Sequence, residues 1–504
     1  MKQFILILLF VFCDNVLSQN PAVYSKDITA PELKEMLYTY ASDDFLGREA
    51  GSKGLRIAVE YLRDRYIKLG ISAAKKDGDY FQYVPLKKEV APKVDFTTEK
   101  QSFSYYDDFI SLSKGPSKLF TTNSYAFVGY GIKDNMYNDY KDIDVSGKLV
   151  VAVVGEPKST NGNYIVSGGK KNSKWSSDRQ SFGAKQNLAK EMGAAAFILI
   201  DEPLFKRYAP YYRHKDQNDG ESNLSLDVNL SPFYAFLAGN RVGNSLIQKA
   251  NGIYTKQIKI NYRSDSEKII SENVIAMIHG SKKPDEYIII SAHLDHIGFH
   301  DGKVYNGADD DGSGTVAILE IAEAFQKAVE NGHGPKRSIV FLHVTAEEKG
   351  LLGSQYYTDY DPVLSLKNTV ANLNIDMIGR TDPKRKRGRR NYIYLIGSDK
   401  LSSDLHKVSE MVNDKFTHIE LDYTYNDEND PNRFYYRSDH YNFAKKNIPI
   451  IFYFNGTHAD YHKATDTADK IQYDLLENRA KLVFHTAWEL ANMKRRIVVD
   501  KNFD

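Results

Sequence analysis

The stretch Tyr287-Ile288-Ile289-Ile290-Ser291-Ala292 is almost continuously apolar and is followed at once by His293. Three further apolar runs of similar length occur at 338–344, 370–375 and 448–454, and an amphipathic helix is expected over 316–325. Continuous apolar strands that alternate with helices are typical of parallel sheets with both faces covered. The sequence therefore predicts an α/β fold with a mostly parallel, twisted sheet flanked by helices.

The 504 residues exceed one ordinary hydrophobic core, so two domains are expected. Residues 31–70 show helical spacing of apolar residues, interrupted by a glycine-rich turn at 44–54. From about 101 to 262 the pattern changes to short β-like runs and polar loops, without a dense cluster of His, Asp and Glu. We interpret 101–262 as a small β-rich insertion between two parts of the main domain, 19–100 and 263–504.

The first residues resemble an export signal. Met1-Lys2 precedes an apolar run, 4–12, that is too short to span a bilayer but has the length of a signal-peptide core. Small residues at Val16 and Ser18 favour a signal peptide over 1–18, cleaved after Ser18, and export to the periplasm or the exterior. A buried first strand is the alternative. No later segment is apolar enough to cross a membrane.

The single cysteine, Cys13, lies inside this signal segment, so the exported chain would contain no disulfide. A lipid anchor on Cys13 is disfavoured by the bulky Phe12 before it. The net charge of +1 gives no argument for nucleic acid, an anionic membrane or an acidic partner. With 42% hydrophobic and 26% charged residues, the composition is that of a globular chain.

Five short motifs with metal-binding side chains follow the expected strands. Reactive groups in open α/β sheets lie just beyond the carboxyl ends of the strands. The candidate residues at these positions are His293 with Asp295, the aspartates of Asn306-Gly-Ala-Asp-Asp-Asp-Gly-Ser-Gly314, Glu347 with Glu348, Asp376, and His462.

Each motif alone has a structural explanation. The aspartates and glutamates suit the first turn of a helix, and His-x-Asp suits a turn. The aspartate loop is not an EF-hand, because alignment on Gly312 places Ile318 where the bidentate glutamate should be. Together, however, the motifs supply two histidines and three acids as ligands, with one glutamate left over. This combination predicts a metal-dependent hydrolase.

The motifs resemble those of peptidase family M28, whose members include co-catalytic zinc aminopeptidases. The resemblance rests on His293-x-Asp, Gly307-Ala-Asp-Asp-x-x-Ser-Gly, Glu347-Glu-x-Gly-Leu-x-Gly-Ser, Asp376-Met-x-Gly-Arg and Tyr461-His-x-x-x-Asp-Thr. The turn at Leu46-Gly-Arg-Glu-Ala-Gly resembles the N-terminal segment of that family. The insertion resembles a protease-associated (PA) domain in Gly147-Lys-Leu-Val-Val and Met192-Gly-Ala-Ala-Ala-Phe-Ile.

The resemblance implies a zinc-exopeptidase fold and a role for each residue. Asp310 would bridge two zinc ions, His293 and Asp376 would complete one site, and Glu348 and His462 the other. Glu347 would be the general base, Asp295 would orient His293, and Tyr461 would stabilise the oxyanion. Zinc is favoured over magnesium or calcium because imidazole ligands suit it. The expected activity is removal of N-terminal residues from peptides.

Other activities remain open at this stage. A glutaminyl cyclase shares the fold but works with one zinc, and a zinc carboxypeptidase would use the same ligands. A receptor-like binding protein on this fold is the non-enzymatic alternative. The basic run 384–390 either is a solvated loop or lies at the site and favours acidic peptides. The partner is a peptide; neither the side-chain preference nor the oligomeric state follows from the sequence.

Overall fold

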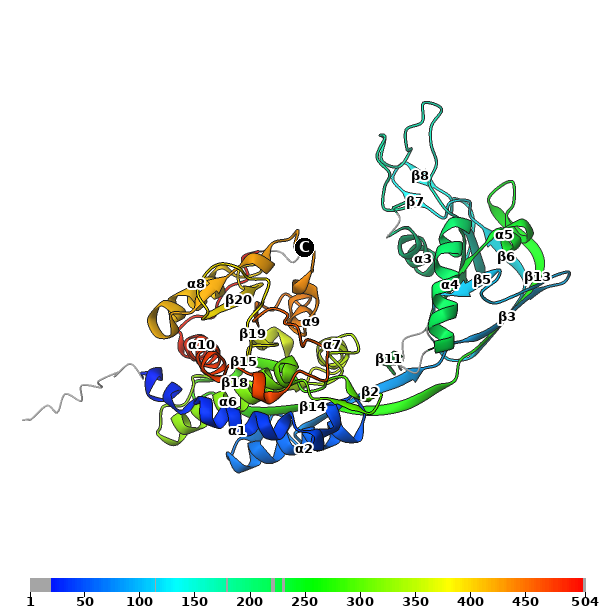
Figure 1. Ribbon diagram of the computed structural model, residues 1–504. Helices are drawn as coiled ribbons and strands as arrows, with labels where there is room; N and C mark the ends of the chain where they lie inside the picture. Colours follow the sequence, from blue (N-terminus) through cyan, green and yellow to red (C-terminus); the bar gives the residue numbers. More distant parts are fainter. Residues whose placement is uncertain (1–19, 114, 178–179, 219–222, 229–231, 502–504) are drawn as a thin grey trace, which may run out of the picture. The chain divides into compact units, whose positions relative to one another are not determined.

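The computed structural model describes residues 20–113, 115–177, 180–218, 223–228 and 232–501 (Figure 1). The expected signal peptide and Cys13 lie outside the described residues. The chain divides into two compact units, one of residues 1–84 and 270–504 and one of residues 85–269. Both boundaries fall within strands, β2 (Phe81–Glu89) and β14 (Ser266–Ile278), whereas the sequence analysis placed them at 100/101 and 262/263. A strand that continues across a boundary has no turn residues to mark it.

The first unit is built on a sheet with the strand order β14-β18-β15-β19-β22-β20-β21. The strands β18, β15, β19 and β22 are parallel to their neighbours in this group. The pairs β14·β18 and β20·β22 are antiparallel, and β21 is parallel to β20. The strands are β15 (Lys283–His293), β18 (Arg337–Val344), β19 (Thr369–Ile375), β20 (Tyr392–Ile396), β21 (Glu420–Asp422) and β22 (Ile450–Phe454). The predicted mostly parallel α/β fold is confirmed.

Helices cover both faces of this sheet. In β15, Ile288 and Ile290 belong to one buried cluster, while Tyr287 and Ile289 belong to another on the opposite face. The first cluster includes side chains of α1 (Ala30–Tyr40), α2 (Lys53–Lys68), α6 (Gly314–Glu330), α8 (Ser403–Val412) and α10 (Tyr473–Asn492). The second includes side chains of α7 (Leu352–Asp359) and α9 (His440–Ala444).

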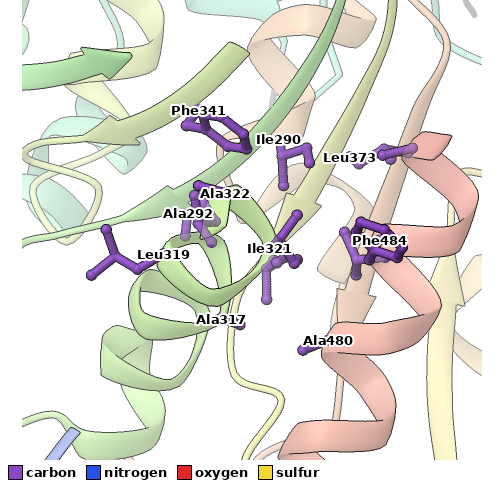
Figure 2. Packing of buried hydrophobic residues seen from close by; sticks show 14 of the residues in the cluster. Ile290, Ala292, Ala317, Leu319, Ile321, Ala322, Phe341, Leu373, Ala480 and Phe484 are labelled. Carbon is purple, nitrogen blue, oxygen red and sulfur yellow. The ribbon is translucent and has the colours of Figure 1, made fainter. Parts of the chain in front are cut away.

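The larger core lies between the parallel strands and the helices α6 and α10. Figure 2 shows Ile321 of α6 and Phe484 of α10 beside Ile290 and Leu373 of the sheet. The rings of Phe325 and Phe484 lie 4.8 Å apart, so α6 and α10 also pack on each other. This packing fixes the first turn of α6, and therefore the aspartate loop before it, against the ends of the strands.

The second unit contains its own sheet, in the order β4-β3-β13-β6-β9-β10-β12-β5. Its centre is parallel, because β9 pairs in parallel with β6 and β10, and β10 with β12. The strands are β3 (Lys93–Thr98), β4 (Ser102–Phe103), β5 (Phe109–Ser111), β6 (Lys118–Phe127), β9 (Leu149–Val153), β10 (Ala196–Ile200), β12 (Tyr234–Ala238) and β13 (Gly252–Arg263). Its helices are α3 (Ser181–Glu191), α4 (Glu202–Asn218) and α5 (Asn240–Leu246). The PA-like character of this unit remains a prediction.

None of the helices in the described ranges combines the length and hydropathy that a membrane span requires.

Candidate metal centre

The carboxyl ends of four parallel strands bring the candidate ligands to one edge of the sheet. His293 is the last residue of β15, and Asp376 directly follows β19. Glu347 and Glu348 come just after β18, and His462 lies in the loop after β22. Since neighbouring parallel strands end at the same edge, residues far apart in sequence meet there.

One group of ligand atoms is formed by His293, Asp310 and Asp376. The Nε2 atom of His293 lies 3.2 Å from Oδ1 of Asp310 and 3.7 Å from Oδ1 of Asp376. All three side chains are buried.

A second group forms around the other oxygen of Asp310. The Nε2 atom of His462 lies 3.1 Å from Oδ2 of Asp310 and 3.1 Å from Oε2 of Glu348. Asp310 therefore faces both groups, one with each carboxylate oxygen. The five residues that the sequence analysis selected as ligands all lie in this double cluster.

The sequence analysis did not select His296, which also lies in the second group. It is fully buried, and its Nδ1 atom lies 2.8 Å from Oε1 of Glu348 and 3.9 Å from Oδ2 of Asp310. The available signal was a second histidine three residues after His293, in the same segment beyond β15.

The donor atoms fit a divalent cation in each group. His293 Nε2, both ring nitrogens of His296, Asp310 Oδ2 and Glu348 Oε1 are buried without a hydrogen bond of acceptable geometry within the described part of the chain. Buried polar atoms normally have partners, and a cation bound in each group would satisfy all of these atoms except Nε2 of His296, because Nδ1 is the nitrogen that faces Asp310 and Glu348. Mixed imidazole and carboxylate donors suit zinc.

The loop that carries Asp310 is held by backbone contacts. Asp466 Oδ2 accepts hydrogen bonds from the backbone N–H groups of Asp309 (2.9 Å) and Asp310 (3.2 Å). Gly307 has φ +52°, and a Cβ atom there would lie 2.5 Å from Cγ of His296 and 2.3 Å from the carbonyl oxygen of Asp310. Only glycine permits this close approach.

Asp309, unlike Asp310, has a structural role. Its carboxylate accepts hydrogen bonds from the N–H of Gly379 (2.6 Å) and from Nδ2 of Asn455 (3.1 Å). It also lies 3.2 Å from Nε2 of His458. Adjacent aspartates thus divide their roles: Asp309 holds the surrounding loops, and Asp310 faces the candidate ligands.

Glu347 lines a small cavity next to the two groups together with Asp310, Asp376, Tyr461 and His462. Burial raises the pKa of the Glu347 carboxyl well above its usual value, and the carboxylates of Asp376 and Glu348 act in the same direction. The backbone N–H of Glu347 donates a hydrogen bond of 3.0 Å to Oδ1 of Asp295. A carboxyl group with a raised pKa is suited to accept and return a proton.

Asp295 contacts His293 through its backbone. Nδ1 of His293 lies 3.0 Å from the carbonyl oxygen of Asp295 and 4.0 Å from its carboxylate Oδ1. A hydrogen bond to a carbonyl fixes the ring orientation of a metal-binding histidine as a carboxylate would. The structure thus connects the Asp295 side chain with Glu347 and the Asp295 carbonyl with His293.

The N-terminal segment reaches the same loops through Arg48. The Arg48 side chain is fully buried and donates hydrogen bonds to four carbonyl oxygens. They belong to Leu294 (3.1 Å), Tyr40 (3.1 Å), Asn306 (2.8 Å) and Gly307 (3.0 Å). Leu294 follows His293, and Gly307 precedes the aspartate loop, so one guanidinium holds both ligand segments in place.

We expect Arg48→Lys to lower the free energy of unfolding by about 3 kcal/mol, because an ammonium cannot reach all four carbonyls and leaves buried acceptors unpaired. Urea denaturation would measure the change. The partly exposed Arg63, which pairs with Asp64 at 2.8 Å, provides a control; Arg63→Lys should alter stability by no more than about 0.5 kcal/mol. Equal stability of Arg48→Lys and wild type would contradict the role of Arg48.

Tyr461 and the basic run lie close to the centre. The Tyr461 ring stacks on His462 with a centroid distance of 3.8 Å, and burial raises the pKa of its phenol, which therefore remains a proton donor.

In the basic run, Arg385 pairs with Glu420 and Asp422, and Arg390 with Asp474. Lys384 donates to Oγ1 of Thr457 (3.2 Å), which lines the Glu347 cavity. Arg385 and Arg390 are therefore both paired with acidic side chains of the protein itself.

The fold and the site define an α/β protein with two candidate metal-binding groups that share one carboxylate. Residues 273–487 match the model of peptidase family M28, so this part of the chain is an M28 peptidase domain. The family predicted from the motifs is confirmed for these residues.

Several known proteins are similar to this chain, over part or most of its length. Aminopeptidase YwaD of Bacillus subtilis (strain 168) is 30% identical over 198 residues, which cover 34% of this chain and 40% of that protein. Probable glutamate carboxypeptidase LAMP1 of Arabidopsis thaliana is 37% identical over 105 residues, 21% of this chain and 14% of that protein. The chain thus aligns with less than half the length of either relative. A solved aminopeptidase from Aneurinibacillus sp. strain AM-1 is similar with a TM-score of 0.49 and 19% identity, covering 96% of this chain and 99% of that one.

Proposed function

We propose that this chain is a zinc-dependent aminopeptidase that hydrolyses the first peptide bond of peptides with a free N-terminus. One observation carries the proposal: two groups of ligand atoms share the buried Asp310, and Glu347 lines the cavity next to them. Shared carboxylates of this kind are typical of two-metal hydrolases.

His293 and Asp376 would hold one zinc ion, Glu348 and His462 the other, and Asp310 both. Two zinc ions bound there would polarise the scissile carbonyl and make a bound water more acidic. Burial opposes protonation of His462, but Asp310 and Glu348 outweigh it and raise the pKa of His462 to about 10. Since a histidine ligand is neutral, zinc binding would release this proton, and the affinity for zinc should increase with pH.

Glu347 moves the proton in this proposal. Its carboxylate takes a proton from the attacking water and gives it to the leaving amine, with the backbone held by Asp295. Tyr461 keeps its phenolic proton and would donate a hydrogen bond to the oxygen of the tetrahedral intermediate. Asp295 has a positioning role only.

The choice of peptide end is part of the proposal. Support for the amino end comes from aminopeptidase YwaD, which aligns over 198 residues, whereas glutamate carboxypeptidase relatives align over 105 to 152 residues.

A set of peptides with blocked ends tests the proposal. We expect hydrolysis of peptides with a free N-terminus, amidated or not at the C-terminus, and no hydrolysis of N-acetylated peptides. A chelator should abolish the activity, and added zinc should restore it. Cleavage from the C-terminus of acetylated peptides would instead indicate a carboxypeptidase. Cyclisation of N-terminal glutamine without hydrolysis would indicate a glutaminyl cyclase, and binding without turnover a receptor-like protein.

We also propose that the protein is exported, on the basis of the apolar run 4–12 and the small residues at Val16 and Ser18.

A further inference from the structure

The cavity beside the metal centre has an uneven lining. Its lining includes three candidate ligands and Glu347. It also includes four buried apolar residues and one cation: Met377, Phe434, Phe452, Phe454 and Arg437. The proposed mechanism uses none of these five side chains. They are therefore available to contact the substrate.

Arg437 is exposed and forms no ion pair with an acidic residue of the described ranges. Its guanidinium lies 5.0 Å from the centroid of the Phe434 ring. A guanidinium near an aromatic ring keeps its N–H groups available in the plane, where they match both oxygens of a carboxylate. Two other cations near the centre are engaged: Arg380 pairs with Asp460 at 3.2 Å, and Lys384 donates to Thr457.

The backbone around Arg437 is attached to the segments that carry the catalytic groups. Oγ of the next residue, Ser438, accepts a hydrogen bond of 2.9 Å from Asn374, two residues before Asp376. Further along, Nδ2 of Asn442 donates to the carbonyl of Leu351 (3.1 Å), in the segment after Glu348. Arg437 is thus held at a fixed place relative to the reacting groups, although its side chain reaches solvent.

We propose that Arg437 binds a carboxylate of the substrate, so that substrates with a carboxylate at this position are preferred. This inference rests on the proposed peptidase function. Two zinc ions would balance the charges of Asp310, Glu347, Glu348 and Asp376, so that an anionic substrate group is not repelled by the centre. The carboxylate belongs either to an acidic side chain of the N-terminal residue or to the free C-terminus of a short peptide. The methylene groups of the substrate would contact the phenylalanine rings.

Matched substrates test this assignment with the zinc-loaded full-length protein. The first arm compares glutamyl with glutaminyl p-nitroanilide, which differ in the side-chain carboxylate. The second compares Leu-Gly with Leu-Gly-amide, which differ in the terminal carboxylate. The variants are Arg437→Gln, Arg437→Lys and the control Arg433→Gln, four residues earlier, whose guanidinium lies 4.7 Å from the Tyr436 ring centroid.

In at least one arm, we expect Arg437→Gln to reduce kcat/KM for the carboxylate substrate about tenfold, mainly through KM, while the neutral partner is unaffected. Arg437→Lys should retain part of the preference, and Arg433→Gln all of it. The arm that responds identifies the source of the carboxylate. An equal effect on charged and neutral substrates, or no effect in both arms, overturns the assignment. Absence of all hydrolysis by the wild type would instead refute the proposed peptidase function.

Discussion

Replacing Glu347 by glutamine should reduce kcat by about 10²–10⁴-fold and leave two zinc ions bound per chain. Glutamine has the same shape but cannot accept the proton of the attacking water. In the structure, Glu347 lines the cavity beside the ligand groups but belongs to neither of them, and burial raises the pKa of its carboxyl. Substrate binding, and therefore KM, should change little. Steady-state kinetics and elemental analysis of the same preparation measure both quantities.

Glu323→Gln on α6 is the matched control for this prediction. Glu323 pairs with Lys327 at 3.1 Å and belongs to neither ligand group, so its replacement should preserve both activity and zinc content. Near-normal turnover of Glu347→Gln would show that another group moves the proton. Loss of zinc together with activity would show that Glu347 is a ligand.

Replacing Asp310 by asparagine should have the largest effect on metal binding, because both zinc ions depend on this carboxylate. Its two oxygens face different groups, 3.2 Å from His293 Nε2 and 3.1 Å from His462 Nε2. Although burial opposes ionisation, the nearby imidazole groups of His293 and His462 lower the pKa of Asp310 well below its usual value, so the residue is charged at neutral pH. At a free zinc concentration that saturates the wild type, we expect less than one zinc per chain and no detectable turnover.

A comparison with Asp376→Asn shows whether Asp310 is shared. Asp376 lies only in the group of His293, so its replacement should weaken the binding of one zinc ion and leave the binding of the other unchanged. The expected zinc content of this variant is therefore close to one. If Asp310→Asn and Asp376→Asn lose the same single ion, Asp310 does not bridge.

The main elements of the site could be predicted because they depend on short-range patterns. Apolar runs marked the parallel strands, and the acids and histidines directly after them met at one edge, as the sheet geometry requires. The ligand loop before α6 also carries a local signal, the glycines that permit its close turns. For such features, a few adjacent residues contain most of the information.

Other features depend on long-range contacts and have no local pattern. Arg48 donates hydrogen bonds to four backbone carbonyls. Because every residue has a backbone carbonyl, the sequence does not show which ones Arg48 contacts. His296 contacts Glu348, which is distant in sequence, so its burial beside the ligands was not evident. The connection of Asp295 with Glu347 likewise depends on where β15 and β18 end. The boundaries of the second unit are hidden because β2 and β14 continue through them.

The contacts of Arg48 also have a consequence for the timing of biosynthesis. Roughly 400 residues separate Arg48 from His462, and both are needed before the double ligand cluster is complete. At about 5–20 residues per second, a ribosome needs roughly 20–80 s to make this length of chain. During that time the growing polypeptide can complete its second unit, but it cannot assemble a working centre. A nascent hydrolase of this kind would remain inactive towards other cellular peptides until its last segment has been synthesised and folded.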